Sequence, residues 1–172
     1  MACVLTQGYQ IPCMDGVGGI KEFYITELAN KSTYTETSGV VTAFTLQTTK
    51  KFWTYALPEE YATFTEELNT NYGNGTNFYK QSFEAQIRKL SASTRNELKL
   101  LAQNRCYIII LDRNGVYWLL GATNGMHMAN STSATGKAFG DFTGYTLKWE
   151  GMEENPMVQV TGSLMATLTV AA

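Results

Sequence analysis

The sequence is short of charge. Only 16% of its 172 residues are Asp, Glu, Lys or Arg, against roughly 25% in typical soluble domains. The 13 basic and 15 acidic residues leave a net charge of -2, so the chain lacks the basic footprint with which proteins neutralise nucleic-acid phosphates. Its surface must be built from Thr, Asn, Gly and Tyr, a composition that favours strands and turns and tolerates burial against another copy.

Cysteine and histidine are also scarce. The three cysteines, at positions 3, 13 and 106, are odd in number and unevenly spread, which argues against a disulfide framework and for a reducing compartment. Zinc ligation by Cys3, Cys13, Cys106 and His127 is disfavoured, because structural zinc ligands usually come in closely spaced pairs. We therefore predict no metal site.

Long apolar runs are absent. Residues 1–16, MACVLTQGYQIPCMDG, have neither a positively charged start nor a continuous apolar segment, so they are not expected to act as a signal peptide. No window approaches the roughly 20 apolar residues that cross a bilayer. We expect a protein that is made in a cytoplasm and does not insert into a membrane.

Patterns that carry chemistry are missing. The single histidine, His127, lies between two methionines with no nucleophile motif beside it, and no G-x-S-x-G occurs. The glycine-rich DGVGGIK and the segment TGKAF both depart from the phosphate-binding loop pattern. Adjacent acidic residues such as Glu153 and Glu154 point to opposite faces if they lie on a strand. The sequence predicts no catalytic residue, no cofactor and no enzyme activity.

The residues that are present predict a mainly β protein. Residues 1–19 mix small and polar positions, end in several glycines and are expected to form an extended arm, and 20–172 to form one domain. Alternation and β-branched residues predict strands at Ile20–Leu28, Val40–Gln47, Phe52–Tyr55 and Ala62–Glu67. The first two are expected to be antiparallel neighbours, separated by a polar break at 30–39. The turn residues at 67–77 predict a long loop or the tip of a long hairpin.

The clearest strand runs from Phe78 to Leu90. Its odd positions are mainly apolar and its even positions from Lys80 to Arg88 are polar, which is typical of a strand with one solvated face. A short helix at about 94–103 follows, with Thr94 and Glu97 at capping-box spacing.

The second half of the domain centres on a hairpin. The apolar segments 105–111 and 116–120 flank Asn114-Gly115, which predicts a type I′ turn. Their uninterrupted apolar character indicates that both faces are covered. Residues 121–141 are expected to form a long loop, 145–149 and 157–160 a final strand pair, and the tail one more strand. The fold class is an antiparallel β-sandwich or barrel with one short flanking α-helix.

Aromatic residues cluster in the middle third of the chain, where they exceed what one small core holds. Plain core packing is one interpretation of this cluster, and burial against a neighbouring subunit is the other, because Tyr, Trp and Phe are enriched at interfaces. The residues chosen as candidates for self-association are Tyr9, Ile11, Phe52, Trp53, Tyr72, Phe78, Lys80 and Glu84.

Three segments resemble virion proteins of tailed bacteriophages. Ser82–Gly125 (SFEAQIRKLSASTRNELKLLAQNRCYIIILDRNGVYWLLGATNG) and Gly140–Val160 (GDFTGYTLKWEGMEENPMVQV) resemble tail tube proteins. The opening CMDGVGGIKEFYITELAN is similar to virion proteins of phages of gut bacteria, including crAss-like phages. The resemblance implies six copies closing into a ring by sheet-edge pairing, and rings stacking through arms and loops into a tube that passes the genome without binding it specifically. It also implies other tail or connector proteins as partners, location in the virion tail, and no catalytic residue.

The sequence is also compatible with other functions. A connector ring or capsid-decorating protein of the same fold would form a ring that never elongates. A β-sandwich that binds host glycans is favoured by exposed Tyr and Trp. An enzyme is the least favoured interpretation, because the residues that would carry it are missing.

Overall fold

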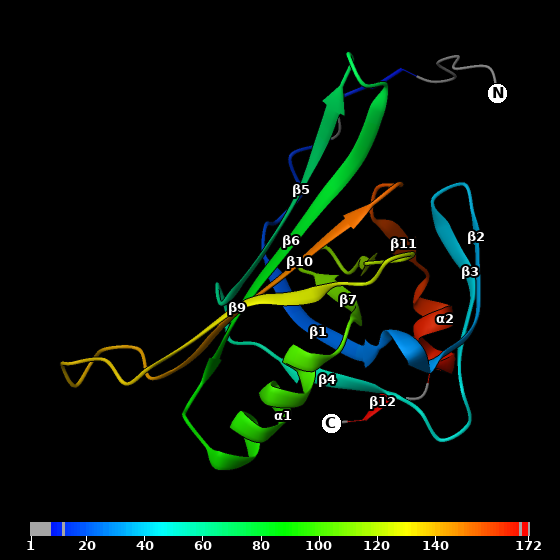
Figure 1. Ribbon diagram of the computed structural model, residues 1–172. Helices are drawn as coiled ribbons and strands as arrows, with labels where there is room; N and C mark the ends of the chain where they lie inside the picture. The colour runs from blue at the N-terminus through cyan, green and yellow to red at the C-terminus, as the bar shows by residue number, and fades with distance from the viewer. Residues whose placement is uncertain (1–7, 12, 169, 172) are drawn as a thin grey trace.

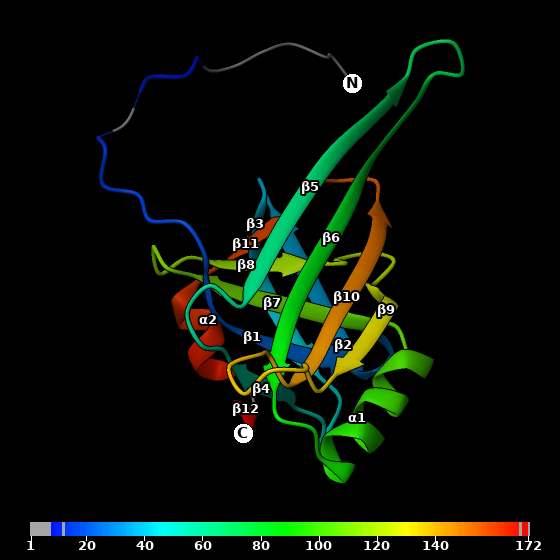
Figure 2. The same ribbon diagram turned by 90° about the vertical axis from the view of Figure 1, so that its left-hand side faces the viewer.

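The computed structural model describes residues 8–11, 13–168 and 170–171. The chain is mainly β with a flanking helix, as predicted, and its strands form two sheets that pack face to face (Figures 1 and 2). The larger sheet has eight strands, in the spatial order β12 (Val170–Ala171), β4 (Phe52–Ala56), β1 (Ile20–Glu27), β7 (Cys106–Asp112), β8 (Tyr117–Leu120), β11 (Val158–Val160), β3 (Val40–Leu46) and β2 (Lys31–Thr37). The smaller has four, in the order β5 (Ala62–Asn71), β6 (Thr76–Arg88), β10 (Gly144–Glu153) and β9 (His127–Ala134).

The main core lies between the two sheets. Phe23 and Ile108 from the larger sheet meet Phe83, Leu147 and Trp149 from the smaller one, and all five are buried. Phe83 and Trp149 stack with ring centroids 5.6 Å apart. The alternation predicted for residues 78–90 is confirmed as far as Arg88, where β6 ends, because the odd positions of β6 face this core.

A second core covers the opposite face of the larger sheet. The apolar run of β7 is buried at every position from Cys106 to Leu111, as predicted, because alternate side chains enter the two cores. Here the sheet curls so that Phe44 of β3 contacts Phe52 of β4 at 5.6 Å between ring centroids. The short helix α2 (Gly162–Thr167) closes this side with Met165. The sequence predicts a strand for this tail, and the tail ends in the two-residue strand β12. Its first part is helical instead, because Thr161 caps a helix by accepting the N–H of Leu164.

The other helix, α1 (Ala92–Gln103), covers the open end between the sheets and buries Leu98. It begins two residues earlier than predicted. The N-cap is Ser91, whose Oγ accepts the N–H of Thr94 at 3.1 Å, so Thr94 lies inside the first turn and does not cap it.

Several expected pairings are wrong. The two strands β1 and β3 are not neighbours, because β1 pairs with β4 and β7. The polar break at 30–39 contains the end of a short 3-10 turn, η1 (Leu28–Asn30), and the strand β2, which pairs with β3. The two strands predicted to form the final pair, β10 and β11, lie in different sheets. Within 121–141, expected to be a loop, His127–Ala134 form the edge strand β9.

The central hairpin is present between β7 and β8, but its turn is not type I′. Gly115 has a φ of +81°, whereas Asn114 is not among the residues with positive φ. The N–H of Gly115 bonds to the carbonyl of Asp112 at 3.2 Å, and the N–H of Asp112 to the carbonyl of Val116 at 3.0 Å. This is a type I turn followed by a G1 bulge.

Candidate assembly surface

The outer face of the four-stranded sheet is largely polar, and only one end of it is covered in the described chain, where Phe142 of the loop after β9 packs against Tyr61. Because side chains alternate along a strand, the residues on either side of the buried Phe83 and Trp149 point outward. This outer face carries Thr63, Thr65, Glu67, Lys80, Ser82, Glu84, Gln86, Thr146, Lys148 and Glu150, together with the apolar Phe78 and Met152 toward the hairpin. In Figure 1 the sheet is seen nearly edge-on, with the eight-stranded sheet and α2 on its other side.

The charges at the centre of the outer face are paired. Nζ of Lys148 lies 2.8 Å from Glu150 Oε1, and Nζ of Lys80 lies 3.7 Å from Glu150 Oε2. The hydrogen bond from Lys148 lowers the pKa of the Glu150 carboxyl and raises the pKa of the Lys148 ammonium. Glu84 is the cross-strand neighbour of Lys148. The face therefore carries opposite charges side by side and no patch of one sign.

The first edge of this sheet, β5, has no partner strand in the described structure. The N–H of Gln86 bonds to the carbonyl of Tyr61 at 2.8 Å, and hydrogen-bonded pairs alternate along an antiparallel ladder. The next such pair is therefore Thr63 with Glu84, and the odd residues of β5 continue the series. The backbone groups that point away from β6 are those of Ala62, Phe64, Glu66 and Leu68.

The second edge, β9, is free in the same part of the chain. The N–H of Lys89 bonds to the carbonyl of Thr143 at 2.8 Å. The odd residues of β10 therefore form their backbone hydrogen bonds with β6, and the even residues form theirs with β9. Ser131 and Ser133 therefore direct their N–H and C=O groups away from the sheet. All residues from Ala129 to Ala134 are exposed.

The hairpin of β5 and β6 projects well beyond the body of the molecule (Figures 1 and 2). The segment 67–77 is thus mostly strand, and the turn itself occupies only 72–75. There the N–H of Gly75 bonds to the carbonyl of Tyr72, and the N–H of Asn74 to Asn71 Oδ1. Tyr72 is fully exposed at the tip.

The described part of the N-terminal arm, residues 8–11 and 13–19, makes few contacts with the body. It is fixed near its end, where the N–H of Val17 donates to Asn114 Oδ1 at 2.8 Å. Tyr9 and Ile11 are 84% and 90% exposed. Cys13 is exposed, and Cys3 lies outside the described residues. The arm therefore displays apolar side chains that no part of its own described chain covers.

The structure places the eight self-association candidates in different environments. Tyr9, Ile11 and Tyr72 are exposed on projecting segments, and Trp53 is 48% exposed beside α1. Phe78, Lys80 and Glu84 are half-buried and lie at even positions of β6, on its outer side. The prediction is wrong for Phe52, which is fully buried in the second core and cannot contact another copy. Its side chain points to the opposite side of β4 from that of Trp53.

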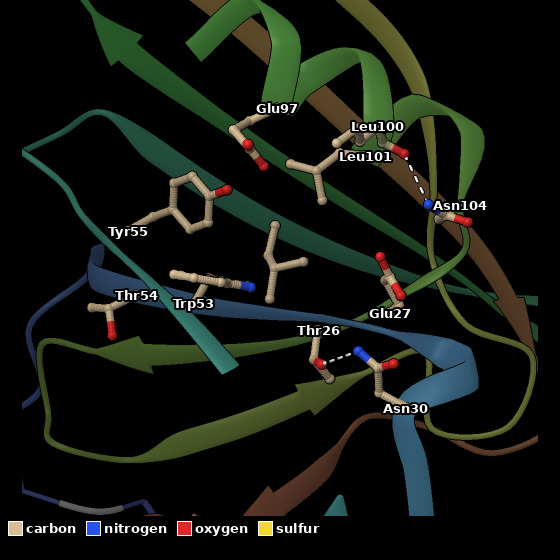
Figure 3. A pocket seen from close by; sticks show the side chains of 11 residues that line it. Thr26, Glu27, Asn30, Trp53, Thr54, Tyr55, Glu97, Leu100, Leu101 and Asn104 are labelled. Carbon is tan, nitrogen blue, oxygen red and sulfur yellow. Dashed lines mark hydrogen bonds between the residues drawn. The ribbon is translucent and has the colours of Figure 1, made fainter. Parts of the chain in front are cut away.

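A pocket of about 430 Å³ lies between α1 and the strands β1 and β4 (Figure 3). Trp53, Tyr55 and Leu101 form its apolar part. Its carboxylates, Glu27 and Glu97, lie on opposite sides in Figure 3 and do not point at each other. This pocket has apolar walls and an acidic rim.

The other flank of the same helix carries a second hollow, the α1–β9 groove, of about 490 Å³. Leu98, Met128 and Tyr145 supply apolar side chains, and Arg95 and Lys99 are the charged residues that line it. Both cations are exposed, and neither makes an ion pair among the described residues. Ser131 and Ser133 of the free edge β9 also face this groove.

The few chemically reactive side chains lie apart from one another. His127 is exposed at the start of β9, and Cys106 is buried in the main core. Burial raises the pKa of the Cys106 thiol to about 12. Within residues 8–11, 13–168 and 170–171, no three His, Cys, Asp or Glu side chains lie close enough together to hold a metal ion. No helix in this part of the chain has the length and apolar character needed to span a bilayer.

Sequence reasoning missed the free edge β9 and the α1–β9 groove. One feature of the sequence did point to the groove. Arg95 and Lys99 are four residues apart on the helix, and two like charges at this spacing slightly destabilise an isolated helix. Comparison with known proteins gives no further guide, because no protein-family model, curated protein or solved structure matches the chain.

Proposed function

We propose that the chain is a structural protein of the tailed-bacteriophage virion, of the tail tube type. Copies join edge to edge into a closed ring, and rings stack into a tube that conducts the genome. The observation that carries this proposal is the four-stranded sheet, whose two edges are both free in the described chain and whose outer face is largely polar and largely uncovered. Exposed edges are usually blocked in monomeric proteins, because they offer unpaired N–H and C=O groups to other chains.

The strand directions support pairing of β5 with the β9 of a neighbour. The four strands are antiparallel throughout, so β5 and β9 run in opposite directions. Rotation about a common axis places β9 of one copy antiparallel to β5 of the next, which continues the same ladder across the junction. An interface between two different surfaces closes into a ring when the rotation is suitable. The resemblance of the sequence to tail tube proteins implies six copies.

In such a ring the outer face of the four-stranded sheet lines the lumen. Its two lysines are paired with Glu150. The face also carries the carboxylates of Glu67 and Glu84, and most of its remaining side chains are Thr, Ser and Gln. DNA binding without sequence preference depends on unpaired cations that replace counterions. A lumen whose lysines are paired and whose carboxylates outnumber them lets DNA pass without holding it, which suits a conduit.

The projecting β5–β6 hairpin favours a tube over a solitary ring. It extends past the body in the direction of the strands, so in a ring it reaches beyond the plane of its own subunits toward the next ring. The fully exposed Tyr72 at its tip supplies an aromatic contact of the kind enriched at interfaces. A connector ring of the same fold has no need of such an extension.

Negative-stain electron microscopy of the purified full chain, at increasing concentration, tests the proposal. Rings that stack into hollow tubes are expected. Rings that never elongate would favour the connector function. A monodisperse monomer at every concentration, checked by sedimentation velocity, would contradict assembly of either kind.

A further inference from the structure

We infer that the α1–β9 groove of one copy binds the N-terminal arm of the adjacent copy in the ring. This inference rests on the proposed function, because it needs β5 and β9 of neighbouring copies to meet. The arm would hold two neighbouring copies together at the β5–β9 junction and would fill a groove that is open in the single chain.

The placement of the arm supports this occupant. The arm leaves the body beside the β7–β8 turn and runs on the β5 side of the four-stranded sheet, whereas α1 and β9 lie at the opposite edge (Figure 2). The arm is therefore far from the groove of its own chain. When β5 meets the β9 of a neighbour, the same arm lies beside the groove of that neighbour.

Charge selects this groove over the pocket on the other flank of α1. Asp15 is the only charged side chain among the first 20 positions, so the arm is acidic. The charged residues that line the α1–β9 groove are Arg95 and Lys99, whereas those of the other pocket are Glu27 and Glu97. An acidic segment is attracted to the first and repelled by the second.

The apolar surfaces also match. Tyr9, Ile11 and Met14 of the arm are each at least 84% exposed, which costs free energy until a partner covers them. The floor of the groove is apolar, formed by the buried Leu98 and Tyr145 and the partly buried Met128. The volume of about 490 Å³ falls within the range of roughly 300–1,000 Å³ found for binding pockets, enough for several side chains of an extended segment.

Native Cys13 allows a direct test by disulfide trapping. In a Cys3→Ser background, Ser133→Cys places a thiol in the groove, while Cys106 is buried and does not compete. Mild oxidation of the assembled protein is expected to give a ladder of covalent dimers, trimers and larger species on non-reducing gels. A ladder is expected because each copy contributes its arm to one neighbour and its groove to the other.

Two matched variants serve as controls. Thr132→Cys lies one residue away on the opposite face of β9, and Asn104→Cys lies in the pocket on the other flank of α1. Both are expected to cross-link far more slowly with Cys13, because a disulfide requires Cα atoms within about 7 Å. Faster linkage by Asn104→Cys would assign the arm to the wrong flank and overturn the inference. Linkage within one chain, or dimers only, would overturn it as well.

A charge exchange provides a second readout. Lys99→Glu is expected to slow assembly severalfold and weaken the Ser133→Cys ladder, and Asp15→Lys in the same chain to restore both. Glu97→Gln, on the other flank of α1, should leave both unchanged. If rings or tubes form but Ser133→Cys yields no ladder, the arm contact is wrong while the proposed function stands. If nothing assembles, the proposed function fails and this inference fails with it.

Discussion

The side-chain Oε1 of Gln81 accepts a hydrogen bond of 2.9 Å from the backbone N–H of Gly121 in the buried space between the two sheets. Gln81 also donates its Nε2 to Glu66 Oε2 at 2.9 Å, and this oxygen accepts the N–H of Met157 at 2.8 Å. One buried side chain on β6 therefore ties the four-stranded sheet to the end of β8. This link helps to hold the candidate assembly surface on the body.

Replacement of Gln81 by Leu is expected to destabilise the folded chain by about 1–3 kcal/mol, because the Gly121 N–H is left buried without an acceptor. Urea unfolding of the two proteins measures the difference in the free energy of unfolding. Gln86→Leu, on the outer face of the same strand, is the matched control and should change it by no more than about 0.5 kcal/mol. Equal effects of the two substitutions would show that the buried bond contributes nothing.

Phe52 and Trp53 are adjacent in sequence but lie on opposite sides of β4. Phe52→Ala is expected to cost about 3–5 kcal/mol, since it empties a fully buried position. Trp53 is 48% exposed with Lys51 Nζ 4.4 Å from its ring centroid, and Trp53→Ala should cost about 1 kcal/mol. Thermal or urea unfolding measures the loss of stability in each variant. A larger loss for Trp53→Ala than for Phe52→Ala would show that Phe52 is not the buried residue of the pair.

The two described cysteines should react very differently with a thiol reagent. Cys13 is exposed, whereas the pKa of Cys106 is raised to about 12, chiefly by burial and further by the nearby Glu27. Because the thiolate is the reactive form, Cys106 is expected to remain unmodified at pH 8 in the folded chain while Cys13 is labelled. Peptide mapping by mass spectrometry after brief labelling reads this out, and rapid labelling of Cys106 without unfolding would contradict it.

The raised pKa of Cys106 also makes stability depend on alkaline pH. The folded chain holds the Cys106 proton up to about pH 12, whereas the thiol of the unfolded chain ionises near its ordinary pKa of 9.0. The contribution of this proton to stability is therefore complete below pH 9 and is lost as the pH rises toward 12. Urea unfolding of the native chain and of Cys106→Ala should show the difference between them shrinking over this range. A constant difference would contradict the shift.

Much of the fold follows from local patterns in the sequence. The strand β6 was predictable because it has one buried and one solvated face, and the hairpin of β7 and β8 because its strands are buried on both faces. The turn type was not, since Asn114-Gly115 also fits a type I turn with a bulge.

The parts that sequence reasoning missed are those whose structure depends on distant partners. The strand β9, HMANSTSA, is exposed from Ala129 to Ala134 and shows no apolar alternation, because its pairing with β10 holds it in place and no core does so. The placement of β10 and β11 in different sheets depends on long-range packing. The candidate assembly surface could not be predicted for the same reason, because a strand is an edge only once the order of the whole sheet is known.

A proline substitution on β5 is expected to block assembly without disturbing the fold. The N–H of Leu68 points away from β6, so Leu68→Pro removes no bond of the β5–β6 ladder but blocks one that a neighbour would use. We expect a folded monomer with nearly unchanged thermal stability and no rings or tubes in micrographs. Glu67→Pro is the control, because its N–H faces β6 and its loss should destabilise the hairpin. Normal assembly of Leu68→Pro would show that the N–H of Leu68 takes no part in the junction.

The pairing of β5 with β9 between copies is tested most directly by electron cryo-microscopy of the assembled protein. We expect a continuous barrel around the lumen, in which β9 of each subunit runs antiparallel to β5 of the next and Lys80, Lys148 and Glu150 face inward. A map in which these two edges remain apart, with subunits joined through other surfaces, would contradict it.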